Sequence, residues 1–310
     1  MASGASSDAS AAGSEPATSQ DTLLDTAARA KGDHERRDEL LATLASRMLH
    51  LEESLLRPPQ VVLLGEGNVG KSSVANLLLG QTLLPTSVIE NTKTPLLLRY
   101  SKKVDLVVLT PDGRRKLDVS QLDAIAEGEL SGLEVGLPSE RLRIFEILDT
   151  PGPTGTTWLE ANPIQQASRL LLWCTSAIQA WKESEQRLYS GLSPELRRHA
   201  LLVVTHKDQL RSEDDRQRVE DRLQALTRRR FRSMTFVNGR ASLAASLDPY
   251  GWQLESGKRQ LEGAIMEELT AMRIRRIREA LRILTKLSRL QRENRRLLRD
   301  GAPDPRQEST

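Results

Sequence analysis

A short apolar run followed by a glycine-rich loop constrains the fold of this chain more than any other feature. Residues 61–64 are wholly apolar, as is typical of a strand buried on both faces of a parallel sheet. Residues 65–72 then fit the pattern G-x-x-x-x-G-K-[ST] in full, and residues 73–79 have the composition of a helix that ends at a glycine. Because this motif needs a strand before it and a helix after it, we predict a phosphate-binding loop.

The residues of this loop suit an anion. Glycine allows backbone N–H groups to crowd around a phosphate, and the N-terminus of the following helix favours negative charge. Lys71 would reach the β- and γ-phosphates of a nucleotide, and the hydroxyl of Ser72 would bind Mg²⁺. The predicted nucleotide-binding residues of the loop are Gly65, Glu66, Gly67, Asn68, Val69, Gly70, Lys71, Ser72 and Ser73.

Composition limits the other possibilities. The 310 residues carry a net charge of only +3, which by itself does not indicate a nucleic-acid-binding protein. The single cysteine, Cys174, lies in an apolar run and suits a reducing compartment, so we expect a cytoplasmic protein. We find no secretory signal and no run of about 18 apolar residues, so any membrane contact would be peripheral, at the inner membrane face.

The chain divides into an α/β domain with a helix on each side. We predict a disordered tail at 1–32, an amphipathic helix at 33–57, the α/β domain at 58–252, C-terminal helices at 253–300 and a tail at 301–310. Both helical regions have an apolar stripe, so we expect them to form a small neck-like bundle. The stripe of the first comprises Leu41, Leu44, Met48, Leu51 and Leu55.

Within 58–252, apolar runs alternate with helical patterns. We predict strands at 96–100, 104–110, 142–148, 170–175, 200–204 and 234–237, helices at 180–190 and 213–230, and an irregular segment at 128–139. This alternation predicts an α/β fold with a mostly parallel sheet flanked by helices. Open sheets of this kind bind ligands at the carboxyl ends of their strands.

Polar motifs follow three of these segments. Thr92 or Thr94, in a turn-rich loop, can add a hydroxyl to Mg²⁺, and the two residues cannot be told apart from sequence. Asp149 follows a strand and can hold Mg²⁺ through water, and the N–H of Gly152 can bond the γ-phosphate. Asp208 can accept the N1–H and N2–H of guanine, which adenine lacks.

In these motifs the chain resembles the dynamin-like family of large GTPases, especially its bacterial members, within the translation-factor-related P-loop GTPases. The resemblance is carried by residues 65–73, by Thr92 three positions before Pro95, and by 98–100, 149–152 and 205–208. It implies a GTP-binding domain that hydrolyses GTP to GDP and phosphate, with Mg²⁺ held by Ser72, Thr92 and Asp149. The remaining predicted guanine-site residues are Thr205, His206, Lys207, Asn238, Gly239 and Arg240. Partners implied are a homodimer across the nucleotide face and an anionic membrane surface.

The sequence departs from the family pattern at three places. His206 stands where the family usually has a lysine, and 236–240 match the fifth motif only loosely. We expect no long helical stalk in these residues, because only about 55 of them follow the domain. Pro153 follows Gly152 where a water-orienting glutamine would stand, so Lys71, Ser72, Thr92, Gly152 and Asn68 remain as the predicted catalytic residues.

Two questions stay open at this point. The charge on the γ-phosphate could be offset by a monovalent cation, K⁺ or Na⁺, beside Asn68, or by a dimer partner. The basic face of the C-terminal helix, rich in arginine from 273 to 299, could belong to a regulatory GTPase switch that binds RNA or a protein partner. Because charge runs usually face water, we favour a solvated face, and nucleic acid is the less favoured partner.

Overall fold

The computed structural model describes residues 19–80, 94–117, 130–152, 169–238 and 257–300, and gives side chains from residue 35 to residue 296 of these ranges. The chain divides into two compact units. One comprises Leu51–Glu279, and the other combines Met1–His50 with Ala280–Thr310. Each unit is described separately below.

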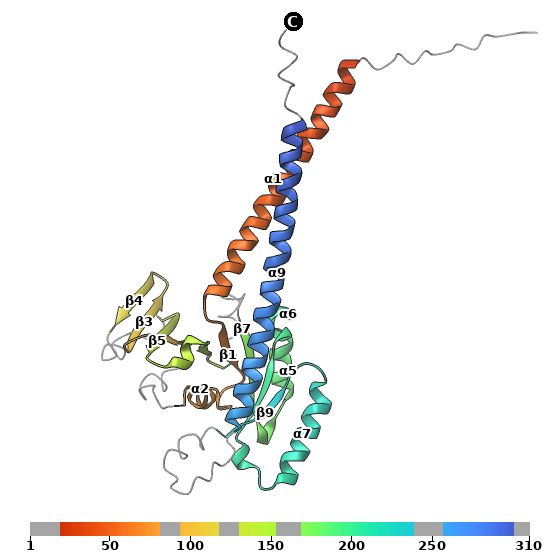
Figure 1. The fold of residues 1–310 in the computed structure, drawn as a ribbon. Coiled ribbons are helices and arrows are strands. Elements are labelled where there is room, and N and C mark those ends of the chain that lie inside the picture. Colours follow the sequence, from red (N-terminus) through yellow and green to blue (C-terminus); the bar gives the residue numbers. More distant parts are fainter. Residues whose placement is uncertain (1–18, 81–93, 118–129, 153–168, 239–256, 301–310) are drawn as a thin grey trace, which may run out of the picture. The chain divides into compact units, whose positions relative to one another are not determined.

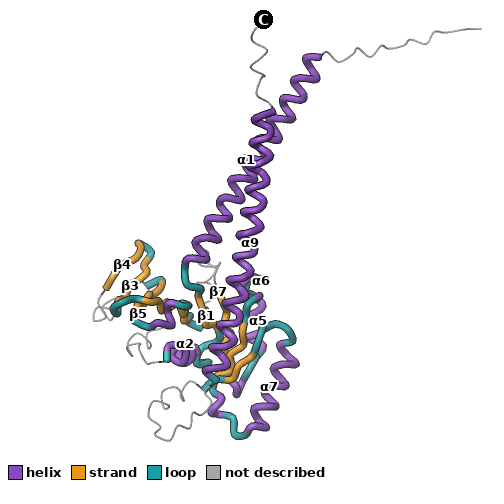
Figure 2. Tube along the Cα trace, in the orientation of Figure 1, coloured by secondary structure: helices purple, strands orange, loops and turns teal. Residues whose placement is uncertain are grey.

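The larger unit is built on a nine-stranded sheet with the order β4-β3-β5-β2-β6-β1-β7-β8-β9 (Figure 1). Helices and strands alternate along most of the unit, as Figure 2 shows by type. The prediction of an α/β domain with a mostly parallel sheet is confirmed. The strands are β1 Gln60–Leu64, β2 Leu96–Tyr100, β3 Asp105–Thr110, β4 Gly113–Leu117, β5 Gly132–Leu137, β6 Glu146–Asp149, β7 Arg169–Ser176, β8 Leu201–Thr205 and β9 Met234–Phe236.

One half of the sheet is parallel throughout. β1 pairs with β6 on one side and β7 on the other, and β8 and β9 continue in the same direction. Every residue of β1 and β8 is buried, which fits their unbroken apolar sequences. The carboxyl ends of β1, β6, β7 and β8 therefore lie along one edge of the sheet.

The other half is mixed, and here the sequence prediction was wrong in part. The segment predicted to be irregular contains β5, which lies between β2 and β3 and separates the two strands that follow each other in sequence. β2 runs antiparallel to β6, and β3 runs antiparallel to both β4 and β5. Residues 132–137 contain two glycines and a glutamate, which are uncommon in strands, so hydrophobicity alone did not predict β5.

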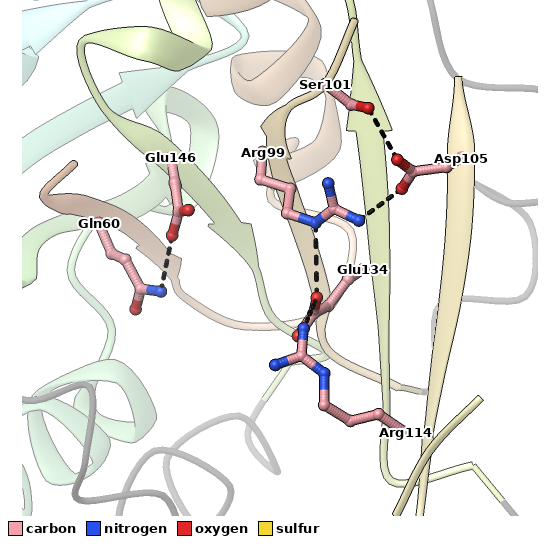
Figure 3. Close-up of polar contacts among 7 residues, drawn as sticks. All are labelled: Gln60, Arg99, Ser101, Asp105, Arg114, Glu134 and Glu146. Carbon is pink, nitrogen blue, oxygen red and sulfur yellow. Dashed lines mark hydrogen bonds and ion pairs between the residues drawn. The ribbon is translucent and has the colours of Figure 1, made fainter. Parts of the chain in front are cut away.

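A polar cluster pins this mixed half together (Figure 3). The guanidinium of Arg99 on β2 donates to Asp105 at 2.5 Å and lies 3.5 Å from Glu134 on β5. Arg114 on β4 reaches the same Glu134 carboxylate at 2.5 Å. Because Glu134 is only 3% exposed, its charge needs both arginines, and the cluster fixes the register of four strands.

Helices cover both faces of the sheet. On one face α2, Lys71–Leu79, and the first part of α9, Lys258–Asp300, pack over β1, β7 and β8. On the other face lie α5, Glu183–Ser190, α6, Pro194–Arg198, and α7, Glu213–Thr227, together with Trp173 and Trp181. Short 3₁₀ turns are η2 Glu140–Arg143, η4 Ala177–Gln179 and η5 Lys207–Gln209.

Two long helices each contribute residues to both units. α1, Ser19–Leu56, begins earlier than the predicted residue 33, and α9, Lys258–Asp300, is one helix where the sequence allowed one or two. The alanine and charged residues of 21–32 are compatible with this extension. Leu261, Ile265 and Met272 of α9 belong to the sheet core, so the start of the stripe assigned to a bundle covers the sheet.

In the smaller unit the outer parts of these helices form one compact body. Leu44 is 8% exposed and Ile283 is 6% exposed, whereas Leu49 is 66% exposed, so each helix buries a defined stripe. No helix among the described residues combines the length and apolarity needed to cross a membrane.

Candidate functional site

The loop between β1 and α2 adopts the conformation that its glycines permit. Gly70, the residue at the N-terminus of α2, has φ 86°, and Asn68 has φ 60°, so both lie in the left-handed region. At Gly65, with φ 151°, an added Cβ would lie 2.3 Å from the backbone oxygen of Cys174. A side chain at this position would force β1 and β7 apart, which explains why the loop must begin with glycine.

Lys71 points back over its own loop. Its Nζ donates to the backbone oxygens of Glu66 at 2.7 Å and Gly65 at 3.3 Å. The side chain is 8% exposed, and burial lowers its pKa, opposed by the nearby Asp149. Within the described part of the chain, carbonyl groups are the only hydrogen-bond acceptors of this ammonium, and an anion there would offset its desolvation.

Ser72 and Asp149, which the sequence analysis predicted to be ligands of one ion, meet at the edge of the sheet. Ser72 Oγ donates to Asp149 Oδ2 at 2.7 Å. The second carboxylate oxygen, Oδ1, is buried and has no hydrogen-bond partner among the described residues. Burial raises the pKa of Asp149 despite the hydrogen bond from Ser72 and the charge of Lys71.

These atoms fit a magnesium ion. Mg²⁺ prefers oxygen ligands and usually takes one or two from the protein while it keeps several waters. The hydroxyl of Ser72 and the carboxylate of Asp149, one oxygen of which has no partner among the described residues, supply that donor set. Among the described residues no group of three or more His, Cys, Asp or Glu side chains forms a separate metal site.

The segment after Asp149 is tied to the loop. Thr150 Oγ1 donates to the backbone oxygen of Leu63 at 2.6 Å, which joins the end of β6 to the end of β1. A Cβ added to Gly152 would lie 3.5 Å from the backbone nitrogen of Gly67. The N–H of Gly152 and the phosphate loop are thus brought to the same place, as expected for two contacts to one phosphate.

Thr205 has a role that the sequence reading did not foresee. It was predicted to contact the nucleotide, but its Oγ1 lies 2.6 Å from the backbone oxygen of Val69 and 3.1 Å from that of Thr175. All three residues are buried. The hydroxyl therefore anchors the phosphate loop to β7 and β8 from behind.

His206 and Asp208 follow β8 directly. His206 has φ 57°, and its Nδ1 lies 3.1 Å from Thr205 Oγ1. An added Cβ on Gly70 would lie 3.5 Å from the His206 ring, so the imidazole stands beside the phosphate loop. Asp208 is exposed and Lys207 half-buried, while Asn238, after β9, is 9% exposed.

Sequence reasoning missed a second layer behind the loop. Lys182 Nζ pairs with the carboxylate of Glu66 at 3.3 Å. Glu185, 1% exposed, accepts from Thr175 Oγ1 at 2.9 Å and from the backbone N–H of Lys182 at 2.9 Å. The signal available in the sequence was one of two glutamates at a helix start, Glu183 and Glu185, and acidic residues are common at the N-termini of helices.

Several predicted site residues lie outside the described residues, namely Thr92, Gly239 and Arg240. Thr94 is described and half-buried, two residues before β2. The start of β2 is in register with Asp149, because Leu96 faces that residue across the antiparallel pair. The segment that contains Thr94 thus enters the sheet beside the carboxylate.

Comparisons with known proteins find similarity to dynamin-like proteins. The sequence model of the dynamin family matches residues 61–208. Dynamin-like protein 2 of Campylobacter jejuni is 28% identical over 183 residues, which is 55% of this chain and 29% of that protein. The isoniazid-induced protein IniC of Mycobacterium tuberculosis is 30% identical over 126 residues, 38% of this chain and 25% of that protein.

A solved structure of an oligomerised bacterial dynamin pair, described as sensing and tethering membranes, has the same fold. It aligns with a TM-score of 0.56 at 19% identity, over 84% of this chain and 46% of that one. The chain spans less than half the length of each of these relatives. By its loop and these matches, the region within residues 61–208 is similar to the dynamin family, and its fold is that of a P-loop GTPase domain.

Proposed function

We propose that this chain binds GTP with Mg²⁺ and hydrolyses it to GDP and phosphate. The observation that carries the proposal is the hydrogen bond from Ser72 to the buried Asp149 beside Lys71, with one carboxylate oxygen that has no partner among the described residues. A buried acceptor without a partner is costly, and a site for an ion explains it. The expected magnesium ligands are Ser72, Asp149 and Thr92.

The chain's own residues would act by position and charge. Lys71 would exchange its two carbonyl partners for the β- and γ-phosphate oxygens, and the N–H of Gly152 would donate to the γ-phosphate. Bound Mg²⁺ would supply neutralisation of the phosphate charge. Thr205 would keep the loop closed behind the phosphates, so its place in this account is that of a positioning residue.

Guanine is the base we assign to the site. Asp208 is exposed after β8, on the same strand end as the residues behind the phosphate loop. An ionised carboxylate accepts hydrogen bonds only, so it pairs with the N1–H and N2–H of guanine and not with adenine. The imidazole of His206 would take the place of the usual lysine along the base.

Base choice is tested by competition between nucleotides. In Asp208→Asn the side chain gains a donor, so we expect preference to move from GTP toward xanthosine triphosphate. Displacement of a fluorescent guanine nucleotide measures this directly for each competitor. If ATP competes as well as GTP against the wild type, guanine is the wrong base.

The charge on the γ-phosphate requires a further positive group. Two routes remain: a K⁺ or Na⁺ ion beside Asn68, whose φ of 60° turns the residue within the loop, or a homodimer across the nucleotide face. Such a group contributes some 10³–10⁵ in rate in related reactions. K⁺ stimulation that Asn68→Ala abolishes would support the ion, whereas specific activity that rises with protein concentration would support the dimer.

Membrane association is the second part of the proposal. The structural relative is described as an oligomeric pair that tethers membranes. For this chain we propose a peripheral, reversible contact with an anionic membrane surface from the cytoplasmic side, together with self-association. Co-sedimentation with anionic and neutral vesicles, each with and without GTP, tests it, and equal pelleting in all four samples argues against it.

A further inference from the structure

Six residues of the larger unit line an open hollow, and five of them are arginines. They are Arg197, Arg198, Arg229, Arg230, Phe231 and Arg232, and the hollow has a volume of about 460 Å³. Arg197 and Arg198 end α6, and the other four residues form the connection from α7 to β9. Such a concentration of one charge is unfavourable unless an anion offsets it.

The hollow lies away from the nucleotide site. α6 precedes the first residue of β8, and the connection precedes the first residue of β9, so both arginine groups lie at the amino ends of parallel strands. The phosphate loop and Thr205 lie at the carboxyl ends. A five-residue strand spans about 16 Å, so a ligand here would not share contacts with the nucleotide.

The guanidinium groups have few acidic partners. Within the described ranges, no carboxylate forms an ion pair with Arg197, Arg198, Arg229 or Arg230, while Arg232 lies 3.9 Å from Glu268. The Nε of Arg197 is buried and has no acceptor in the described part of the chain. A buried charged donor without an acceptor calls for an explanation, and a bound anion supplies one.

The backbone that presents these side chains is fixed. The hydroxyl of Tyr189 donates to the backbone oxygen of Arg230 at 2.8 Å, and the N–H of Arg232 donates to the backbone oxygen of Ala200 at 2.8 Å. Arg229 has φ 60°, a conformation that costs energy for a residue other than glycine. The side chains therefore project from a preformed frame.

We propose that this arginine hollow binds an anion that carries several phosphate groups. The planar guanidinium offers two parallel N–H donors that match the oxygens of a phosphate, and binding to several forks at once favours a ligand with more than one phosphate over a single carboxylate. The ligand comes either as a free polyphosphate or as the headgroups of an anionic lipid surface. The proposal does not depend on the identity of the nucleotide.

The test uses the full chain under two conditions that keep the probe from binding at the phosphate loop. Calorimetric titration with sodium tripolyphosphate is run on GDP-saturated protein and again on Lys71→Ala. Flotation with vesicles of phosphatidylcholine, with and without phosphatidylglycerol, provides the lipid arm. The site variant is Arg229→Gln with Arg230→Gln, and Arg198→Gln is a second variant that alters a different wall.

The control removes equal charge elsewhere. Arg115 is exposed on β4 and Arg218 is 80% exposed on α7, so Arg115→Gln with Arg218→Gln is the matched double variant. We expect the site variants to bind about tenfold or more weakly and the control to bind as the wild type does. Tripolyphosphate binding identifies a soluble ligand, and flotation only with phosphatidylglycerol identifies the membrane.

Three results would overturn the proposal. The first is that the wild type binds neither probe at low salt. The second is that the site variants bind as tightly as the wild type. The third is that the control loses as much affinity as the site variants, because net charge alone would then account for the binding.

Discussion

Removing the hydroxyl of Thr205 should destabilise the phosphate loop. In Thr205→Val the side chain keeps its shape but loses the hydroxyl, whose single proton is shared between the backbone oxygens of Val69 at 2.6 Å and Thr175 at 3.1 Å. All three residues are buried, so water cannot readily replace the hydroxyl. Leaving a buried acceptor unsatisfied costs about 1–3 kcal/mol.

This cost translates into a melting shift. For a unit of this size, 1 kcal/mol corresponds to about 2–4 °C, so we expect the variant to melt about 2–12 °C lower. Nucleotide affinity should fall as well, because the loop loses its anchor to β7 and β8. Thr205→Ser keeps the hydroxyl and should recover most of both effects.

Scanning calorimetry of the nucleotide-free protein measures the shift. The matched control is Thr270→Val, which removes an exposed threonine hydroxyl that donates to the backbone oxygen of Met266 at 2.7 Å within α9. That bond faces water, so its loss should be nearly neutral. If Thr205→Val melts with the wild type and binds nucleotide equally well, the hydroxyl does not anchor the loop.

Two further predictions concern burial. Asp149→Asn should raise the free energy of unfolding of the nucleotide-free protein by about 0.5–2 kcal/mol, and its melting temperature with it. The same change should weaken Mg²⁺-dependent GTP binding. Burial raises the pKa of Asp149 in the folded state, so the wild type loses stability as pH rises through that pKa and the carboxylate becomes charged. The difference in melting temperature between the variant and the wild type should therefore widen as pH rises. A difference that narrows as pH rises would contradict this. Leu44→Asp, at a side chain 8% exposed, should lower stability by about 2–5 kcal/mol or cause aggregation, whereas Leu49→Asp, at 66% exposed, should not, and equal melts for the two would argue against a buried stripe in the smaller unit.

The part of the site that is contiguous in sequence could be predicted from sequence. Residues 65–72 are proposed to bind through their own backbone, so the spacing of glycines and lysine contains most of the information. The Ser72–Asp149 pair followed because both residues end up at the same edge of a parallel sheet. Its geometry agrees with the expectation of two ligands at one point.

Contacts between distant segments could not be predicted in this way. The anchor from Thr205 to Val69 and the pair of Lys182 with Glu66 depend on which strands are neighbours. The same holds for β5, which pairs between β2 and β3 and whose buried Glu134 lies against Arg99 and Arg114 from two other strands. None of these partners is close enough in sequence to leave a periodic pattern.

The central claim is that the loop around Lys71 binds a guanine nucleotide, and calorimetric titration of GTP with Mg²⁺ tests it most directly. Removing the ammonium in Lys71→Ala takes away the charge that faces the β- and γ-phosphates. We predict saturable binding of GTP to the wild type and none detectable to the variant, with both proteins folded by circular dichroism. Equal affinity of the two proteins for GTP would contradict the account.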